Sequence, residues 1–240
     1  YTLTLNNFTD TKLLMNYLSA PISLVLPPKS ALPYSSYTAY VTNNQTAMLA
    51  KVARTAAPTA TLNVNSIQLE VVPDKLLIFV RRQISSQNAR SSDAFLEIRG
   101  ISITFGNRSG ILSNASQEDL WQLSKSNKCN IDYRGFKGLA SVYTAANPNV
   151  GEVATCGSVL ALSPTYDFGL QSPFVANGSI GQWNLQVKLD VANNFSEAVT
   201  PEVVIVAVRA GLLVSSSGQS TLTTNLLNAS MVTETIEKGE

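Results

Sequence analysis

The feature that most constrains the fold of this chain is the segment 71–82, VVPDKLLIFVRR, in which a nearly continuous apolar run lies between charged residues. A Pro-Asp pair predicts a tight turn before the run, and KLLIFV has no polar face. A strand that is apolar on both faces is normally covered on both sides. The segment therefore predicts a central strand of a β-sandwich, or one beneath a helix or a long loop. We expect Phe79 in the core, with Lys75, Arg81 and Arg82 where the strand emerges.

Strand signals dominate the rest of the chain, because β-branched and aromatic runs alternate with polar residues and are bounded by Gly, Pro, Asn and Ser. The predicted strands lie near residues 1–8, 22–26, 36–42, 60–71, 75–82, 95–105, 157–163, 182–192, 201–209 and 211–215. The alternation within 60–71 slips by one residue at Asn65–Ser66, which is what a β-bulge produces. The pattern predicts an all-β fold, an antiparallel β-sandwich of the jelly-roll kind.

One short α-helix is predicted within residues 113–128, SNASQEDLWQLSKSNK. Asn114 can cap its N-terminus, with an amide side chain three residues on and two acidic residues in the first turn. Leu120, Trp121 and Leu123 give it an apolar side, which we expect to pack across an end of the sandwich. Residues 127–156 have weak periodicity and predict a long inter-strand excursion that contacts other subunits.

Composition indicates a single domain with a weakly charged surface. The chain has 240 residues, of which 14% are charged and 45% apolar, and its formal net charge is +1. A surface rich in Ser, Thr and Asn suits burial against other subunits, and the low charge argues against a specific nucleic-acid ligand. No apolar stretch is long enough for a membrane span. We expect a sandwich domain over 1–225 and a C-terminal arm over 226–240, and the start at Tyr1 suggests a processed protein or a fragment.

The two cysteines, Cys129 and Cys156, are too few for a disulfide scaffold. Both a bridge between them and two free thiols are compatible with the sequence. Seven N-x-S/T triplets occur, against roughly four expected by chance, so they do not establish secretion.

The sequence carries no motif for a reaction. It has no histidine, which excludes Ser-His-Asp and Cys-His nucleophiles and His-based zinc sites, and it lacks the glycine-rich phosphate-binding motifs. Paired carboxylates for glycoside hydrolysis remain conceivable. The candidates are Glu70, Asp74, Asp93, Glu97, Asp167 and Asp190. Most of them follow strand ends or turns, where a solvated carboxylate is the ordinary state, so we predict no catalytic, cofactor-binding or metal-binding residues.

Four arginines could form an RNA-binding patch, and two tryptophans could stack on sugars. Arg81, Arg82, Arg90 and Arg99 bracket one region, but arginines at strand ends usually pair with acidic residues, and no aromatic residues interleave with them to stack bases. Trp121 and Trp183 are interpreted as core or interface anchors rather than sugar-stacking platforms.

Two thirds of the chain resembles the major capsid proteins of the double-jelly-roll lineage that includes the adenovirus capsid protein, in the form carried by polinton-like viruses and virophages. The resemblance rests on a PD(K/R)L-I-FVR strand, an I-x-I-x-F-x-N-x-SG-LS strand and turn, and an S-Q-x-(D/E)-L-(W/Y) helix. The matching residues are Pro73, Asp74, Leu76, Ile78, Phe79, Val80, Arg81, Ile101, Ile103, Phe105, Asn107, Ser109, Gly110, Leu112, Ser113, Gln117, Asp119, Leu120 and Trp121. CGSVLALSPTYDFGL, GSIGQWNLQVKLDVAN and PEVVIVAVRAGLLV are similar to the later strands of that family.

The resemblance implies a viral structural protein of the virion capsid and no enzyme. In that family a subunit carries two jelly rolls, and three subunits form a pseudo-hexagonal capsomer of an icosahedral shell. This chain has room for one jelly roll, which the motifs indicate to be the C-terminal one. The expected partners are two further copies in a homotrimer, neighbouring capsomers, and penton and minor or cement capsid proteins. The alternatives are a single-jelly-roll penton protein and a carbohydrate-binding attachment module, with a two-carboxylate enzyme third.

Overall fold

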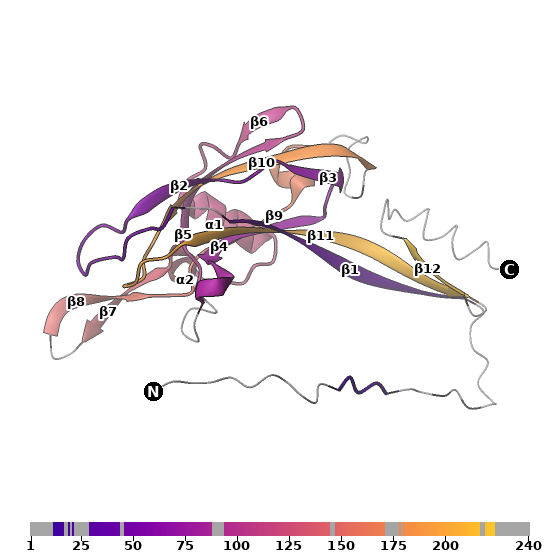
Figure 1. Cartoon of the computed structure of the whole chain (residues 1–240), viewed down its shortest axis with the longest axis horizontal. Helices are drawn as coiled ribbons and strands as arrows, with labels where there is room; N and C mark the ends of the chain where they lie inside the picture. The colour runs from indigo at the N-terminus through magenta and orange to yellow at the C-terminus, as the bar shows by residue number, and fades with distance from the viewer. Residues whose placement is uncertain are drawn as a thin grey trace.

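The computed structural model describes residues 12–16, 19, 21, 29–43, 46–87, 94–144, 147–170, 178, 180–216 and 219–223. These residues form an antiparallel β-sandwich of two five-stranded sheets, with a separate two-stranded sheet beside it (Figure 1). The predicted all-β sandwich is confirmed. The strands predicted near 1–8 and 22–26, and the arm over 226–240, lie outside the described residues.

Sheet 1 has the strand order β1-β11-β4-β9, with β12 also paired to β11, and sheet 2 has the order β2-β10-β5-β6, with β3 also paired to β10. The strands of sheet 1 are β1 (Lys29–Thr42), β4 (Lys75–Arg82), β9 (Val159–Leu162), β11 (Pro201–Ser216) and β12 (Gln219–Thr223). Those of sheet 2 are β2 (Thr59–Asn63), β3 (Ile67–Val71), β5 (Glu97–Phe105), β6 (Arg108–Ile111) and β10 (Ile180–Ala192).

The connectivity is that of a jelly roll. If β2 and β3 count as one strand, and β12 and the two-stranded sheet are left aside, sheet 1 holds the first, eighth, third and sixth strands along the chain. Sheet 2 holds the second, seventh, fourth and fifth. Two interlocked Greek keys give this order, in which successive strands repeatedly cross between the sheets.

The core lies between the sheets and is built from alternate residues of each strand. In β10, Leu185, Val187 and Leu189 are buried, whereas the residues between them are polar and exposed. Toward one end the core is aromatic: the buried ring of Phe105 stacks on Trp183 with centroids 5.5 Å apart and lies 5.5 Å from Phe168. This alternation is the reason the two-residue period was readable in the sequence.

Strand β4 is central in sheet 1, between β11 and β9, as its apolar run predicts. Leu76, Ile78 and Val80 have no exposed surface and face the core. The prediction that Phe79 lies in the core is wrong, because the two-residue period turns it with Leu77 to the other side of the sheet, where both are half-buried. Among the described residues, no helix lies over that side of the strand as the apolar run had suggested.

The predicted slip in the 60–71 segment is a real register shift. Asn63 pairs with Lys188 and Ile67 with Leu185, so the segment advances four residues while β10 moves back three. The extra residue separates β2 from β3, and Val64 bridges the break with a hydrogen bond from its N–H to the Val187 carbonyl at 2.8 Å.

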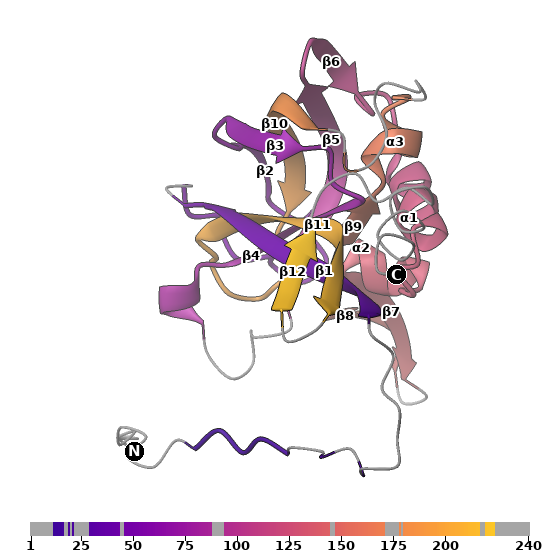
Figure 2. The same cartoon turned by 90° about the vertical axis from the view of Figure 1, so that its right-hand side faces the viewer.

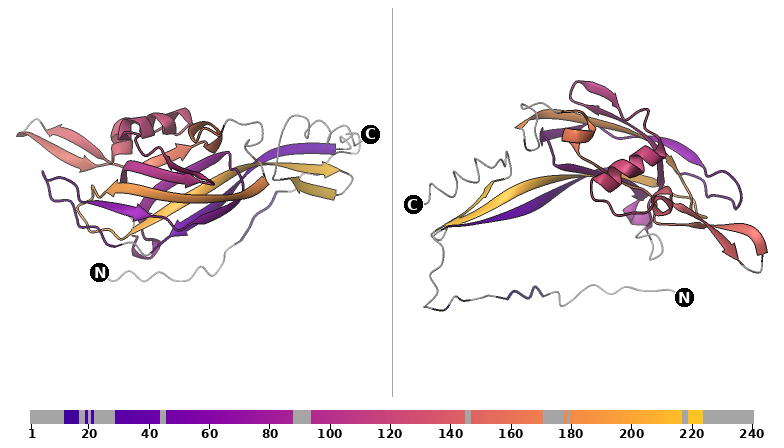
Figure 3. Two further views of the ribbon diagram at one scale, coloured as in Figure 1. Left: turned by 90° about the horizontal axis from the view of Figure 1, so that it is seen from above. Right: turned by 180° about the vertical axis from the view of Figure 1, so that it is seen from behind.

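The two strands predicted at 201–209 and 211–215 form one continuous strand, β11. Its second half pairs with the first half of β1, so β1 begins at Lys29 rather than near 36. Gly211 of β11 pairs with Tyr34 of β1. A Cβ on Gly211 would lie 2.2 Å from Cζ of Tyr34, so only glycine leaves room for that ring. Together with β12, these halves project from the sandwich as a ribbon (Figures 1 and 3).

Helix α1 (Gln117–Ser126) is confirmed, but its N-cap is Ser116 instead of Asn114. Ser116 and Asp119 form a reciprocal capping box, in which Asp119 N–H donates to the serine hydroxyl and the carboxylate accepts from the serine backbone. The helix lies beside edge strand β9 and not across an end of the sandwich (Figure 2). The buried Ser124 hydroxyl accepts the N–H of Ala161 at 3.2 Å.

The excursion over 127–156 contains regular structure that the weak periodicity did not predict. It holds helix α2 (Tyr133–Lys137) and a hairpin of strands β7 (Leu139–Thr144) and β8 (Asn147–Ala154). Gly138 ends α2 in the left-handed region, at φ 73°. The hairpin projects from the sandwich at the end opposite β12 (Figure 3). Two short helical turns, η1 (Ile84–Ser86) and α3 (Pro164–Asp167), complete the fold.

Candidate assembly surfaces

The side of sheet 1 that faces away from the core is lined by rows of apolar side chains. Directly paired residues of neighbouring strands point to the same side of a sheet. The rows are Tyr37–Val208–Lys75, Ala39–Val206–Leu77–Ala161 and Val41–Val204–Phe79–Val159. Two of the rows are apolar across four strands. We call these residues, without Lys75, the sheet 1 outer face.

The sheet 1 outer face is accessible in part. The side chains of Tyr37 and Val41 are 67% and 48% exposed, Leu77, Phe79 and Val208 are half-buried, and Val204 and Ala161 are buried. The ring of Phe79 contacts that of Phe95 edge-on, with centroids 5.1 Å apart. Clustered apolar side chains that stay partly exposed often mark an interaction site. The sequence contained its signal: VVIVAV in β11 and LLIFV in β4 lack the alternation that a solvated outer side produces.

A groove of about 430 Å³ opens on this face. It is lined by Tyr37, Leu77, Val159, Ala161 and Val208 from the sheet, by Asp74 and Lys75 before β4, and by Asn127, Lys128 and Cys129 after α1. The lining therefore combines apolar side chains with two lysines and one aspartate. Lys75 donates to the Asn127 carbonyl at 3.1 Å, which connects the start of β4 to the end of the helix.

The corresponding side of sheet 2 is polar. Its cross-strand rows are Asn63–Lys188–Ser102, Thr61–Asp190–Gly100, Gln186–Thr104 and Gln68–Asn184. Thr61 donates its hydroxyl to the Asp190 carboxylate at 2.6 Å. We call these residues the sheet 2 outer face, and its composition is that of a surface in contact with water.

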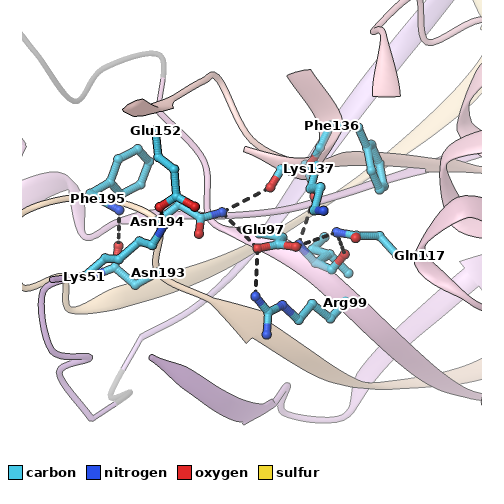
Figure 4. Close-up of polar contacts among 12 residues, drawn as sticks. Lys51, Glu97, Arg99, Gln117, Phe136, Lys137, Glu152, Asn193, Asn194 and Phe195 are labelled. Atoms are coloured by element: carbon cyan, nitrogen blue, oxygen red, sulfur yellow. Dashed lines mark hydrogen bonds and ion pairs between the residues drawn. The ribbon is translucent and has the colours of Figure 1, made fainter. Parts of the chain in front are cut away.

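A buried carboxylate organises one end of the sandwich. Glu97 is 2% exposed, and it accepts hydrogen bonds from Gln117 at 2.9 Å, Asn194 at 2.8 Å and Arg99 at 3.3 Å (Figure 4). Asn194 also donates to the Lys137 carbonyl at 3.1 Å. These five residues, the polar hub, join β5, α1, α2 and the loop after β10. Because a buried charge is tolerated only when it is hydrogen-bonded, the hub fixes how these elements meet.

The hairpin β7–β8 is attached to the sandwich next to the polar hub. Lys51 forms an ion pair with Glu152 of β8 (Figure 4). Val142 and Val153 are 39% and 51% exposed. Because an isolated two-stranded hairpin is marginally stable in water, this one relies on its attachment. The predicted contact role of the 127–156 excursion stays a prediction.

The described carboxylates considered for glycoside hydrolysis belong to different parts of the domain. Glu70 and Asp190 are on the outer side of sheet 2, and Asp74 lies in the turn before β4. Glu97 belongs to the polar hub, and Asp167 accepts hydrogen bonds from Asn127 and the Ser163 N–H. Asp93 lies outside the described residues. Within the described ranges, no group of three or more His, Cys, Asp or Glu side chains could hold a metal ion.

The arginines pair with acidic residues, as strand-end arginines commonly do. Arg81 donates twice to buried Glu202, at 2.6 and 2.8 Å, and Arg82 donates to Glu197 at 2.7 Å. Arg99 contacts Glu97 in the polar hub. Arg90 lies outside the described residues. The guanidinium groups of Arg81, Arg82 and Arg99 therefore bind carboxylates of the domain itself.

The two tryptophans pack within the domain, which fits their interpretation as anchors. Trp183 is half-buried with its ring stacked on Phe105. Trp121 donates its ring N–H to the Ile131 carbonyl at 2.9 Å, and the Lys125 ammonium lies 5.2 Å from the centre of its ring. A stacked sugar needs an open ring face, and on Trp121 the cation covers one.

Both cysteines are free thiols in this structure. Cys129 is half-buried beside the groove, and its thiol lies 3.8 Å from the Val159 carbonyl. Burial raises the pKa of the Cys129 thiol, and the neighbouring Cys156 raises it further. The thiol is therefore protonated near neutral pH and is a weak nucleophile there.

Fold and surfaces together define a jelly-roll domain with a hydrated sheet on one side and an apolar sheet on the other, a design typical of proteins that assemble. The family model of the major capsid protein V20 C-terminal domain matches residues 37–211. The chain belongs to this family of viral capsid domains.

Known relatives agree with that assignment. The putative capsid protein V20 of the Sputnik virophage is 31% identical over 221 residues, covering 88% of this chain and 36% of the relative. In the 3.5 Å cryo-EM structure of the Sputnik virophage, one chain matches 88% of this chain with 29% identity and a TM-score of 0.74, over 42% of its own length. The mavirus major capsid protein shares the fold, with a TM-score of 0.66 and 19% identity over 89% of this chain and 45% of that one.

The chain thus spans less than half the length of these relatives, and the family domain that it matches is C-terminal. Among the described helices, none is long and apolar enough to cross a membrane.

Proposed function

We propose that this chain is the C-terminal jelly roll of a major capsid protein subunit in the virion, and that three subunits form a pseudo-hexagonal capsomer of an icosahedral shell. The observation that carries this proposal is the sheet 1 outer face, two rows of which are apolar across four strands. Such a surface supports permanent burial against another protein domain. Family membership supplies the kind of assembly.

The role is mechanical. The jelly roll supplies a rigid wall, because its core is closed between two sheets and its long strands run the length of the domain. The projecting elements at the two ends, the β7–β8 hairpin and the ribbon of β1, β11 and β12, are placed to reach neighbours (Figure 3). In this proposal they contact adjacent capsomers and penton or minor capsid proteins, and residues 226–240 form an arm beyond the 1–225 domain. The subunit catalyses no reaction.

The proposal is tested by the mass of the natural polypeptide in its source particle. A mass of about twice 25.7 kDa or more is expected for a two-roll subunit. Native mass spectrometry of gently dissociated particles should then give a species of three such polypeptides. A polypeptide near 25.7 kDa would instead leave a single-jelly-roll penton protein or a carbohydrate-binding module, and binding on a glycan array would favour the latter.

A further inference from the structure

We propose that Tyr34, Trp183 and Arg209 form a carboxylate-binding site at one end of the sandwich, and that the acidic C-terminal arm of a neighbouring copy fills it. We call these three residues the donor site. The inference rests on the proposed function, and it adds how the arm of one copy is held by the next.

Two members of the donor site lie on the core side of sheet 1, where the ribbon leaves the sandwich (Figure 1). Arg209 is two residues beyond buried Ala207 in β11, so both side chains point to the core side. Tyr34 of β1 pairs with Gly211, which is two residues further along β11. A Cβ on Gly211 would lie 2.5 Å from Oη of Tyr34. The hydroxyl therefore lies over the backbone of β11, two residues from Arg209.

The third member lies on the core side of sheet 2, at the same end of the sandwich. Trp183 of β10 pairs with buried Leu69 of β3. A Cβ on Gly181 would lie 2.9 Å from Nε1 of Trp183, so the indole N–H lies over the first residues of β10. The short turn after β3 leads into β4, whose start pairs with β11 at Val208. This turn therefore holds the two sheet ends, and the three side chains on them, opposite each other.

Each side chain of the donor site has a buried polar atom without a hydrogen-bond partner. The atoms are the Tyr34 hydroxyl, Nε1 of Trp183 and Nε of Arg209, and none of them finds an acceptor within the described part of the chain. Arg82 and Asn194 also have one such atom, but both bind carboxylates through other atoms. An unsatisfied buried polar group costs free energy. Three of them at one end of the sandwich indicate a place where a partner binds.

The chemistry of the three groups defines the ligand. The N–H groups of arginine and tryptophan can only donate hydrogen bonds, and a tyrosine hydroxyl can donate one. Three donors and one fixed positive charge favour an anionic acceptor. A carboxylate meets this need, because its two oxygens accept from a guanidinium and from further donors at once. The rings of Tyr34 and Trp183 favour an apolar residue beside that carboxylate.

The C-terminal arm supplies a segment of this chemistry. Residues 226–240 read LLNASMVTETIEKGE, with three glutamates and one lysine. Glu234 and Glu237 flank Ile236, so an apolar side chain lies between two carboxylates in the sequence. The arm is therefore complementary to the donor site in charge and in its apolar content.

The position of the carboxylates along the arm favours an exchange between copies. β12 ends at Thr223, which pairs with Leu212, the neighbour of Gly211. A link of a few residues would reach the donor site of the same copy, but residues 224–233 contain no carboxylate. Glu234 is eleven residues beyond Thr223, a length that spans up to about 36 Å when extended. A small domain is about 30 Å across, so the arm is long enough to reach an adjacent copy.

Peptide binding tests the donor site. A fluorescently labelled peptide of residues 226–240 is titrated onto the full natural polypeptide, which carries Glu234→Gln and Glu237→Gln so that its own arms do not compete. We expect saturable binding by fluorescence anisotropy. The affinity should fall at least tenfold when the peptide carries the same two substitutions, and should change less than twofold for a Lys238→Gln peptide. Absence of saturation, equal affinity for the acidic and the Gln peptides, or tighter binding of a labelled single-stranded DNA would each overturn the proposal.

Tyr34→Phe separates binding from stability, because it removes only the hydroxyl. That hydroxyl has no acceptor among the described residues, so the melting temperature of the unliganded protein should stay unchanged or rise. Peptide affinity should nevertheless fall at least threefold. Tyr37→Phe, on the other side of β1, is the matched control and should leave the affinity unchanged. An unchanged affinity in Tyr34→Phe would remove the hydroxyl from the site. Arg209→Gln should lower the affinity at least tenfold, with circular dichroism confirming its fold.

A mixing experiment tests whether the arm passes between copies. One polypeptide carries Arg209→Gln and a native arm, and the other carries Glu234→Gln and Glu237→Gln and a native donor site. Neither variant alone can form the contact. When the two are coexpressed, arms of the first can fill sites of the second, so the particle yield should exceed that of either variant alone at least threefold. A mixture no better than its components would overturn the exchange.

The titration and the intact mass separate the two possible failures. A two-roll polypeptide that forms trimers but does not bind the peptide leaves the proposed function standing and overturns only the donor site. A polypeptide near 25.7 kDa overturns the two-roll subunit, and the same titration still decides whether the donor site binds the arm.

Discussion

The outer sides of the two sheets differ although both belong to five-stranded antiparallel sheets over one core. In β10 every second residue is polar, and Gln186, Lys188 and Asp190 are exposed. In β4 the equivalent positions are Leu77 and Phe79. Both strands are central in their sheets, so the difference does not come from their place in the fold. The outward residues of a strand therefore reflect the surroundings of that side of the sheet, and they do not follow from the strand's position in the fold.

Substitutions on the two sides of β4 should give the largest difference in stability. Ile78→Ala removes a fully buried side chain between the sheets and should cost about 3 to 4 kcal/mol of unfolding free energy. Phe79→Ala removes a half-buried ring that contacts Phe95, and should cost about 1 to 2 kcal/mol in the isolated chain. Urea unfolding measures both. If the two costs were equal, the outer side would be core after all.

Removal of a buried and of an exposed carboxylate of sheet 2 should give the next largest difference in stability. Glu97→Ala leaves Asn194 and Gln117 without their buried acceptor and should cost about 2 kcal/mol. Glu70→Ala removes an exposed carboxylate from the outer side and should change stability by less than about 0.5 kcal/mol. Differential scanning calorimetry gives the comparison. A Glu97→Ala protein as stable as the Glu70→Ala control would mean that the polar hub contributes nothing.

An isosteric exchange tests the two outer faces directly. Val206→Thr makes the sheet 1 outer face more polar, and Thr104→Val makes the sheet 2 outer face more apolar; both positions are half-buried. Each should change the unfolding free energy of the isolated chain by less than about 1 kcal/mol. Binding of a hydrophobic dye should fall for the first variant and rise for the second. Unchanged dye binding in both would show that neither face is accessible.

Helix α1 borders the sheet 1 outer face, and its cap should give a pH effect. Hydrogen bonds from the Ser116 hydroxyl and backbone N–H lower the pKa of Asp119 in the folded protein. A lowered folded pKa contributes stability that is present above the ordinary carboxyl pKa and is lost as the pH falls through the folded value. Ser116→Ala should therefore flatten the acid side of the melting-temperature profile. Parallel profiles for the two proteins would assign the acid limb to other groups.

The smallest effect on folding is expected from deletion of residues 226–240, which lie beyond the jelly-roll strands. The melting temperature should stay unchanged, whereas the particle yield should fall if this arm contacts neighbours. A normal particle yield from the shortened chain would remove the arm from assembly.

Sequence patterns predicted the parts of the fold where local chemistry and tertiary contacts agree. The alternation in 182–192 and the apolar run of 75–82 are both strands of the sheets, and the one-residue slip before Ile67 is a register shift. The 127–156 excursion was not predicted as regular structure, because α2 is short and the β7–β8 hairpin contacts the sandwich through the Lys51–Glu152 ion pair, whose partners are far apart along the chain.

Sequence by itself therefore determined the fold class, the absence of histidine chemistry and the family of the chain, since composition, period and motif are properties of neighbouring residues. Only the tertiary structure decided which side of the strands that are apolar on both faces lies against the core. Phe79 shows this most clearly: in an apolar run its neighbours are equally hydrophobic, so the core side is fixed by register against β11 and β9. The same register brings Tyr37, Val208 and Leu77 onto one surface, because residues far apart in sequence meet only when strands pair.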